Sequence, residues 1–103
     1  MKPYRAEKIA ALIRNEISII MQQKVYDPRL NFVDISYVRI STDLRMAKVY
    51  ISVIGDDEAK KQAIEALQKA KGFIKRELAK RMIMRFMPDL EFVIKEEGKD
   101  LES

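Results

Sequence analysis

A strict two-residue alternation over residues 46–53 constrains the fold more than any other feature of the sequence. One set of positions is apolar and the other is mixed: Ala47, Val49, Ile51 and Val53 alternate with Met46, Lys48, Tyr50 and Ser52. Because successive side chains of a strand point to opposite faces, this pattern predicts a strand with one buried face. Residues 33–42 are rich in β-branched side chains, and Thr42, Asp43 and Leu44 supply a turn, so we expect an antiparallel hairpin.

Helical periodicity precedes the hairpin. Over residues 4–24 the apolar positions recur three and four apart, namely at Ile9, Leu12, Ile13, Ile17, Ile20 and Met21. This spacing predicts an amphipathic helix. Pro28 ends it, because proline fixes φ and pushes Asp27 out of the helical region.

A second helical pattern follows Gly55, where Asp56 or Asp57 can cap the helix start. Its inner face carries Ala63, Leu67 and Ala70, and the pattern restarts after Gly72, where we expect a break between two helices. We expect the second helix to end before Pro88, with Met82 as its earliest end. Residues 90–95 alternate again and predict a third, half-buried strand.

The expected order is therefore helix, strand, strand, helix, helix, strand. The connection between the last two strands must cross the sheet, which leaves the helices on one face. The fold class is α+β, with a three-stranded sheet in a single domain over residues 1–95. Residues 96–103 form a short acidic tail.

Charge is distributed unevenly along the chain. Up to Pro88 there are 18 Lys or Arg against 10 Asp or Glu, whereas from Asp89 onward there are 2 against 6. A basic body of this kind attracts polyanions such as nucleic acid, and an acidic membrane surface could use the same field. The most lopsided stretch runs from residue 69 to 85, where a single acid, Glu77, accompanies seven basic residues: Lys69, Lys71, Lys75, Arg76, Lys80, Arg81 and Arg85.

Several function classes are disfavoured by composition. The chain has no cysteine and no histidine, which removes thiolate and imidazole ligands and the usual general base near neutral pH. We therefore expect no enzyme activity, no cofactor and no metal; the acidic residues 56–58 favour a helix start over a carboxylate metal site. No apolar run approaches the length of a membrane span, so the cytoplasm is the expected compartment.

Four motifs, in this order and spacing, resemble the ribosome-binding factor A family over essentially the whole chain. They are Asp27-Pro28-Arg29 after the first helix, Val38 to Ser41 followed by Asp43-Leu44 and then Ala47-Lys48-Val49-Tyr50, Ala70-Lys71-Gly72, and Pro88-Asp89-Leu90-Glu91-Phe92. Each motif alone is weak, but their joint order is specific.

The resemblance implies a type II KH-like fold, in which an Ala-x-Gly kink at Ala70-Lys71-Gly72 replaces the Gly-x-x-Gly loop of ordinary KH domains. It also implies a non-catalytic bacterial factor that binds the small ribosomal subunit and its rRNA. Such factors assist ribosome biogenesis, rRNA processing and cold adaptation. We expect the chain to act as a monomer, with no small-molecule substrate and no membrane partner.

The expected RNA contacts centre on the kink and the following helix, where backbone amides at a helix start can also bind phosphate. The candidate RNA-binding residues are Lys8, Arg29, Arg39, Arg45, Lys71, Gly72, Lys75, Arg76, Lys80, Arg81 and Arg85. Two interpretations without RNA binding stay open. The basic residues can form the solvated face of a helix, or they can form local ion pairs such as Arg29 with Asp27 or Arg45 with Asp43.

The aromatic residues are expected to be mainly core, with Tyr37 and Tyr50 the better candidates for stacking on bases. Met82, Met84 and Met87 are expected to fill gaps in the core. The alternative function is a protein-interaction adaptor on the ribosome, which contacts a ribosomal protein or another assembly factor through the exposed side of the hairpin.

Overall fold

The computed structural model describes residues 3–84 and 86–95 as a three-stranded sheet with two long helices. The elements in chain order are α1 (Pro3–Lys24), the short 3-10 helix η1 (Pro28–Leu30), β1 (Val33–Ile40), β2 (Met46–Val53), α2 (Asp57–Arg81) and β3 (Asp89–Ile94). Neither helix, as far as the description extends, is long and apolar enough to cross a bilayer. The predicted contact Arg85 and the predicted acidic tail, 96–103, lie outside the described residues.

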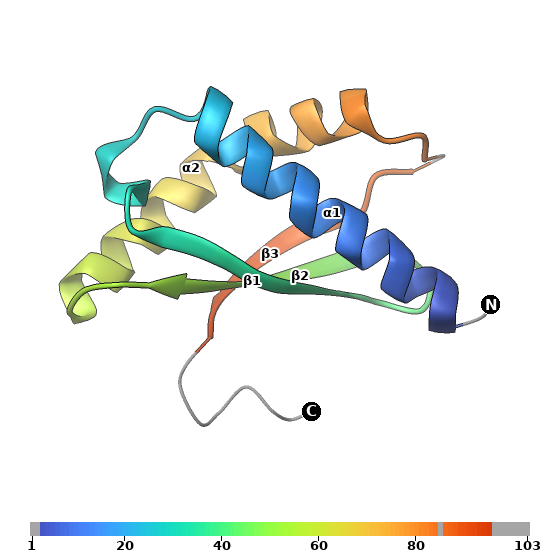
Figure 1. Cartoon of the computed structure of the whole chain (residues 1–103), viewed down its shortest axis with the longest axis horizontal. Coiled ribbons are helices and arrows are strands. Elements are labelled where there is room, and N and C mark those ends of the chain that lie inside the picture. Colours follow the sequence, from blue (N-terminus) through green and yellow to red (C-terminus); the bar gives the residue numbers. More distant parts are fainter. Residues whose placement is uncertain (1–2, 85, 96–103) are drawn as a thin grey trace.

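The sheet has the order β1-β2-β3. Strands β1 and β2 form the expected antiparallel hairpin, and β3 pairs in parallel with β2. Parallel neighbours need a crossover connection, which α2 supplies. Both helices lie on the same side of the sheet (Figure 1), so the predicted α+β architecture is confirmed.

The core lies between the sheet and the helices. In β2 the alternation works as predicted, with Ala47, Val49 and Ile51 fully buried. They pack with side chains from both helices and β3 in one cluster that includes Ile13, Ile17, Ile20, Leu67, Ile74, Leu78, Leu90 and Phe92. Two predicted core positions are wrong: Leu12 lies at the edge of the α1 stripe and is 52% exposed, and Phe86 follows the end of α2 and is 75% exposed.

Helix α2 is continuous through Gly72, so the predicted break into two helices is wrong. Gly72 does not have a positive φ and is not a helix C-cap. Continuity has a physical reason, since Leu67 before Gly72 and Ile74 after it are buried in the same core and an unbroken helix keeps its hydrogen bonds. The ribbon of α2 does change direction along its length (Figure 1), as the predicted kink requires. The helix ends at Arg81, with Met82 as its C-cap.

The start of α2 is built by two residues. Gly55 has φ +150°, and a Cβ there would lie 2.7 Å from the Cβ of Ala59, so this position requires glycine. Asp56 is the N-cap, and its Oδ1 accepts a hydrogen bond from the backbone N–H of Ala59 at 2.9 Å. Asp57 and Glu58 occupy the first turn, where the helix dipole favours acids.

Candidate nucleic-acid interface

Four exposed positions of α2 form a ridge along the helix. They are Lys69, Gly72, Arg76 and Lys80, spaced three, four and four apart, which places them on one side of a helix. We call them the basic ridge. A Cβ on Gly72 would lie 3.5 Å from Nη1 of Arg76, so this guanidinium lies beside the bare backbone of the glycine. Because the helix does not begin at Gly72, the predicted helix-start amides for phosphate binding are absent there.

Lys71 and Lys75 lie one turn apart on α2 and converge on one carboxylate. Their Nζ atoms lie 3.6 Å and 3.2 Å from Oδ1 of Asp89 at the start of β3. The hydrogen bond from Lys75 and a second one from the backbone N–H of Leu90 lower the pKa of Asp89. Two ammonium groups therefore share one negative charge.

The two basic residues at the end of α2 also have acidic partners. Lys80 Nζ lies 3.0 Å from Oε2 of Glu77, and this hydrogen bond lowers the pKa of Glu77, but the Lys80 side chain stays 72% exposed. Arg81 Nη1 lies 3.4 Å from Oε1 of Glu16 on α1, so Arg81 connects the two helices. Glu16 is thus an ion-pair partner from a distant part of the chain.

Arg29 has the local partner that the sequence left open. Its Nε and Nη2 donate to Oδ1 and Oδ2 of Asp27 at 3.1 Å and 2.8 Å, a bidentate pair that lowers the pKa of Asp27. The Asp27 carboxylate also accepts the Arg29 backbone N–H at 3.0 Å and so caps η1. The Asp-Pro-Arg motif is therefore a folded turn, packed against α2 through η1.

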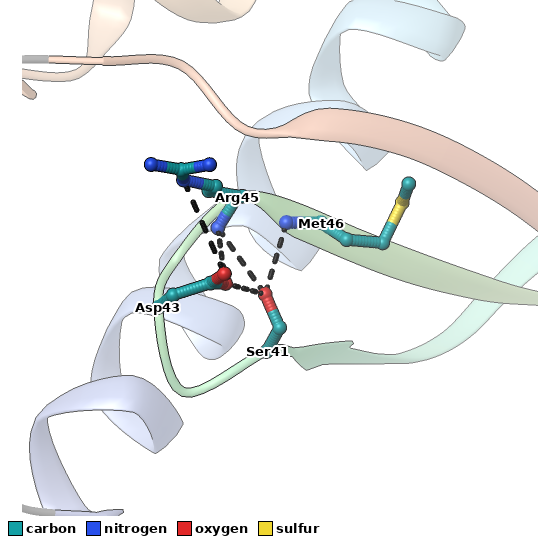
Figure 2. A network of polar contacts seen from close by, with 4 residues as sticks. All are labelled: Ser41, Asp43, Arg45 and Met46. Atoms are coloured by element: carbon teal, nitrogen blue, oxygen red, sulfur yellow. Dashed lines mark hydrogen bonds and ion pairs between the residues drawn. The ribbon is translucent and has the colours of Figure 1, made fainter.

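Arg45 lies in the turn between β1 and β2 (Figure 2). Ser41 and Asp43 fix this turn: the Asp43 carboxylate accepts from the Ser41 hydroxyl at 2.7 Å and from the Arg45 backbone at 3.1 Å. The bond from Ser41 is the main reason that the pKa of Asp43 is lowered. The Arg45 side chain itself is 87% exposed and its Nε lies 4.0 Å from Asp43, so it can still reach a ligand.

The remaining candidates are not gathered with the basic ridge. Arg39 lies in β1 directly opposite Lys48 of β2, on the sheet face away from the helices. Lys8 lies at an exposed position of α1. The sequence therefore predicted one cationic surface where the structure has at least two, separated by the sheet.

The charge balance on α2 stays positive despite the ion pairs. Between Lys69 and Arg81 the helix carries six basic residues, and the carboxylates paired with them are Glu77, Asp89 and Glu16. Exposed ion pairs of this kind are weak and exchange readily for another anion. Lys69, which the predicted binding set lacked, and Arg76 form no ion pair within residues 3–84 and 86–95. This surface can bind a chain of phosphates.

We expect Asp89→Asn to lower the melting temperature slightly at pH 6 and to have a smaller effect near pH 2. The pKa of Asp89 is below its usual 3.8 in the folded chain, so its ion pair stabilises the fold above that value and stops doing so as the pH falls through the lowered pKa. The shift should be a few degrees at most because the pair is partly exposed. Thermal unfolding of both proteins at the two pH values checks this, and an equal deficit at both would contradict it.

Sequence and structure comparisons place the chain among known proteins. Residues 5–102 match the family model of ribosome-binding factor A. The chain belongs to the ribosome-binding factor A family. Ribosome-binding factor A of Desulfatibacillum aliphaticivorans is 43% identical over 102 residues, which cover 96% of this chain and 83% of the relative.

A solved structure and a fitted homology model share the architecture described above. The solution NMR structure of a Thermotoga maritima protein superposes with a TM-score of 0.81 at 34% identity, covering all of this chain and 98% of the other. A homology model of Thermus thermophilus ribosome-binding factor A, fitted into the cryo-EM map of a 30S complex, has a TM-score of 0.72 at 30% identity. It covers 85% of this chain and 92% of that one.

Proposed function

We propose that this protein binds the RNA of the small ribosomal subunit through α2 and assists late maturation of that subunit without catalysing a reaction. The observation that carries the proposal is the surplus of cations on α2 from Lys69 to Arg81. Family membership supports it, as does the Thermus thermophilus relative fitted into a 30S complex. A non-catalytic role also fits a chain without histidine or cysteine.

The mechanism would be a shift between conformations of the RNA. Lysine and arginine contacts to phosphates fix the position of a protein on RNA but do not read its sequence. If the basic ridge and the Lys71–Lys75 pair match the phosphates of one rRNA conformation better than another, binding favours that conformation. No bond has to be made or broken, which suits an assembly factor.

We expect the affinity for small subunits to fall steeply as salt is raised. Each phosphate contact to single-stranded RNA contributes a log-log slope of roughly −0.7, because binding releases counterions. Sedimentation of the protein with immature and mature subunits, at several salt concentrations, measures both the slope and the preference. A flat salt profile would contradict RNA binding, and equal cosedimentation with both particles would contradict a role in maturation.

A second candidate is contact with a ribosomal protein or another assembly factor. The observation that favours it is a groove of about 1000 Å³ beside the end of α2. The groove is lined by large apolar side chains, some of which are exposed: Ile9, Leu12, Leu44, Met82, Ile83, Met84, Phe86 and Met87. Met82 and Met87 also pack against the core as predicted, whereas Met84 lines the groove without joining the core cluster.

A further inference from the structure

The face of the sheet opposite the helices is open in the part of the chain that the structure describes. Both helices lie on the other side (Figure 1). The alternation along β2 also places this face away from the core. Val49 and Ile51, which point toward the helices, are fully buried, whereas Lys48 is exposed and Tyr50 is half-buried. We call this surface the open face.

A β-bulge in β1 places a tyrosine on the open face. The register shifts between Ile35 and Tyr37, and Ile35 and Val38 are both buried. The two residues between them, Ser36 and Tyr37, therefore both point away from the core. Arg14 of α1 supports the bulge, since its Nε donates to the backbone carbonyl of Ser36 at 3.2 Å.

The bulge brings two aromatic rings together. Tyr37 is directly opposite Tyr50, and the ring centroids are 4.5 Å apart with 15° between the planes. The rings form a stacked pair with half-buried side chains. Nζ of Lys95 lies 5.8 Å from the centroid of Tyr37. Beside the pair, the hydroxyls of Ser36 and Ser52 hydrogen-bond at 2.8 Å.

Cations lie next to the aromatic pair. Arg39 and Lys48 are direct cross-strand partners, two residues along each strand from the tyrosines and so about 7 Å away. Both positions are exposed, so their cationic groups lie at the surface beside the tyrosines. Glu91 is the partner of Lys48 in β3, yet Lys48 forms no ion pair among residues 3–84 and 86–95. Asp34, the partner of Ser52, is a further acid that the register places on this face.

A groove connects the open face with the edge of the sheet. It has a volume of about 690 Å³ between α1 and β1, and Arg14, Tyr37 and Arg39 are among the residues that line it. Glu7 also lines it. An extended chain on the open face could therefore continue past Arg39 around the edge of β1.

We propose that the open face binds single-stranded RNA, with an unpaired base stacked on the Tyr37–Tyr50 pair and a neighbouring phosphate bound by Arg39 and Lys48. The inference rests on the proposed function, because it assumes that RNA is the ligand, and it adds a second contact surface to that of α2. Bases in a duplex are already stacked, so only an unpaired base can use such an aromatic pair. The open face would thus discriminate single strands, whereas the basic ridge binds phosphates of either form.

The test uses the full chain with a ten-nucleotide single-stranded RNA of mixed sequence and the same RNA as a duplex. We expect Tyr37→Leu/Tyr50→Leu to lose about ten-fold or more in affinity for the single strand. Affinity for the duplex should stay unchanged. Tyr37→Phe/Tyr50→Phe should bind like the wild type, because phenylalanine keeps the aromatic face. Tyr26→Leu is the matched control, since Tyr26 is 87% exposed and lies beyond the end of α1.

Ultraviolet cross-linking of the unmodified chain to the single strand, mapped by mass spectrometry, gives a readout that does not depend on the folding of a variant. Cross-links in peptides that contain Tyr37 or Tyr50 support the proposal. Cross-links confined to residues 69–81, or a leucine variant with undiminished single-strand affinity, overturn it and leave the proposed function standing. A leucine variant that keeps RNA affinity but loses subunit affinity would mean a protein contact, which also overturns it. If neither RNA binds the unmodified chain, the proposed function fails as well.

Discussion

Replacing Lys69, Arg76 and Lys80 together by glutamate is expected to lower the affinity for small ribosomal subunits by at least about a hundred-fold. These three cations form the basic ridge with Gly72, and two of them form no ion pair with another described residue. A hydrogen bond to a charged group is worth roughly 1.5–3 kcal/mol, and 1.4 kcal/mol corresponds to a factor of ten. Cosedimentation at low salt measures the loss.

The matched control for this variant changes net charge equally at another place. Arg5, Lys60 and Lys61 are three cations outside the ridge and outside the predicted binding set. Their replacement by glutamate should weaken binding far less, because a specific surface depends on where the charge lies and a general attraction depends on its sum. Equal losses of affinity in both variants would mean that the basic ridge acts only through its share of the protein's overall positive charge. Normal binding by the ridge variant would favour the protein contact at the groove instead.

Local patterns predicted the elements of the fold well. The alternation over 46–53 coincides with β2, and the cap at Asp56 and the helix end near Met82 are where turn chemistry indicates. Gly72 is the instructive exception. Its intrinsic preference for ending a helix is outweighed by the burial of Ile74 and Leu78 beyond it, which a continuous α2 keeps in the core.

The site was predicted less completely because its details depend on distant residues. The sequence identified the cluster of cations on α2, but their partners come from other elements: Asp89 is 14 positions from Lys75, and Glu16 is 65 positions from Arg81. The bulge that turns Tyr37 to the open face has no local sequence signal either. It is visible only once the pairing register of β1 and β2 is known.

The second large effect concerns stability, and we expect Leu67→Ala to lower the free energy of unfolding by about 2–5 kcal/mol. Leu67 is fully buried and packs in the cluster that joins both helices to the sheet. Alanine keeps the helix propensity of α2, so the loss reports the missing core contacts and the cavity that remains.

A loss of 2–5 kcal/mol would be a large part of the 5–15 kcal/mol that typically separates folded from unfolded domains. Leu12→Ala is the matched control, since it is the same substitution on α1 at a side chain that is 52% exposed, and it should cost much less. Urea unfolding of the three proteins decides the point. If the two variants lose the same free energy of unfolding, the side chain of Leu67 does not help to hold α2 against the sheet. The inference that the basic ridge lies on a rigidly packed helix would then have no support.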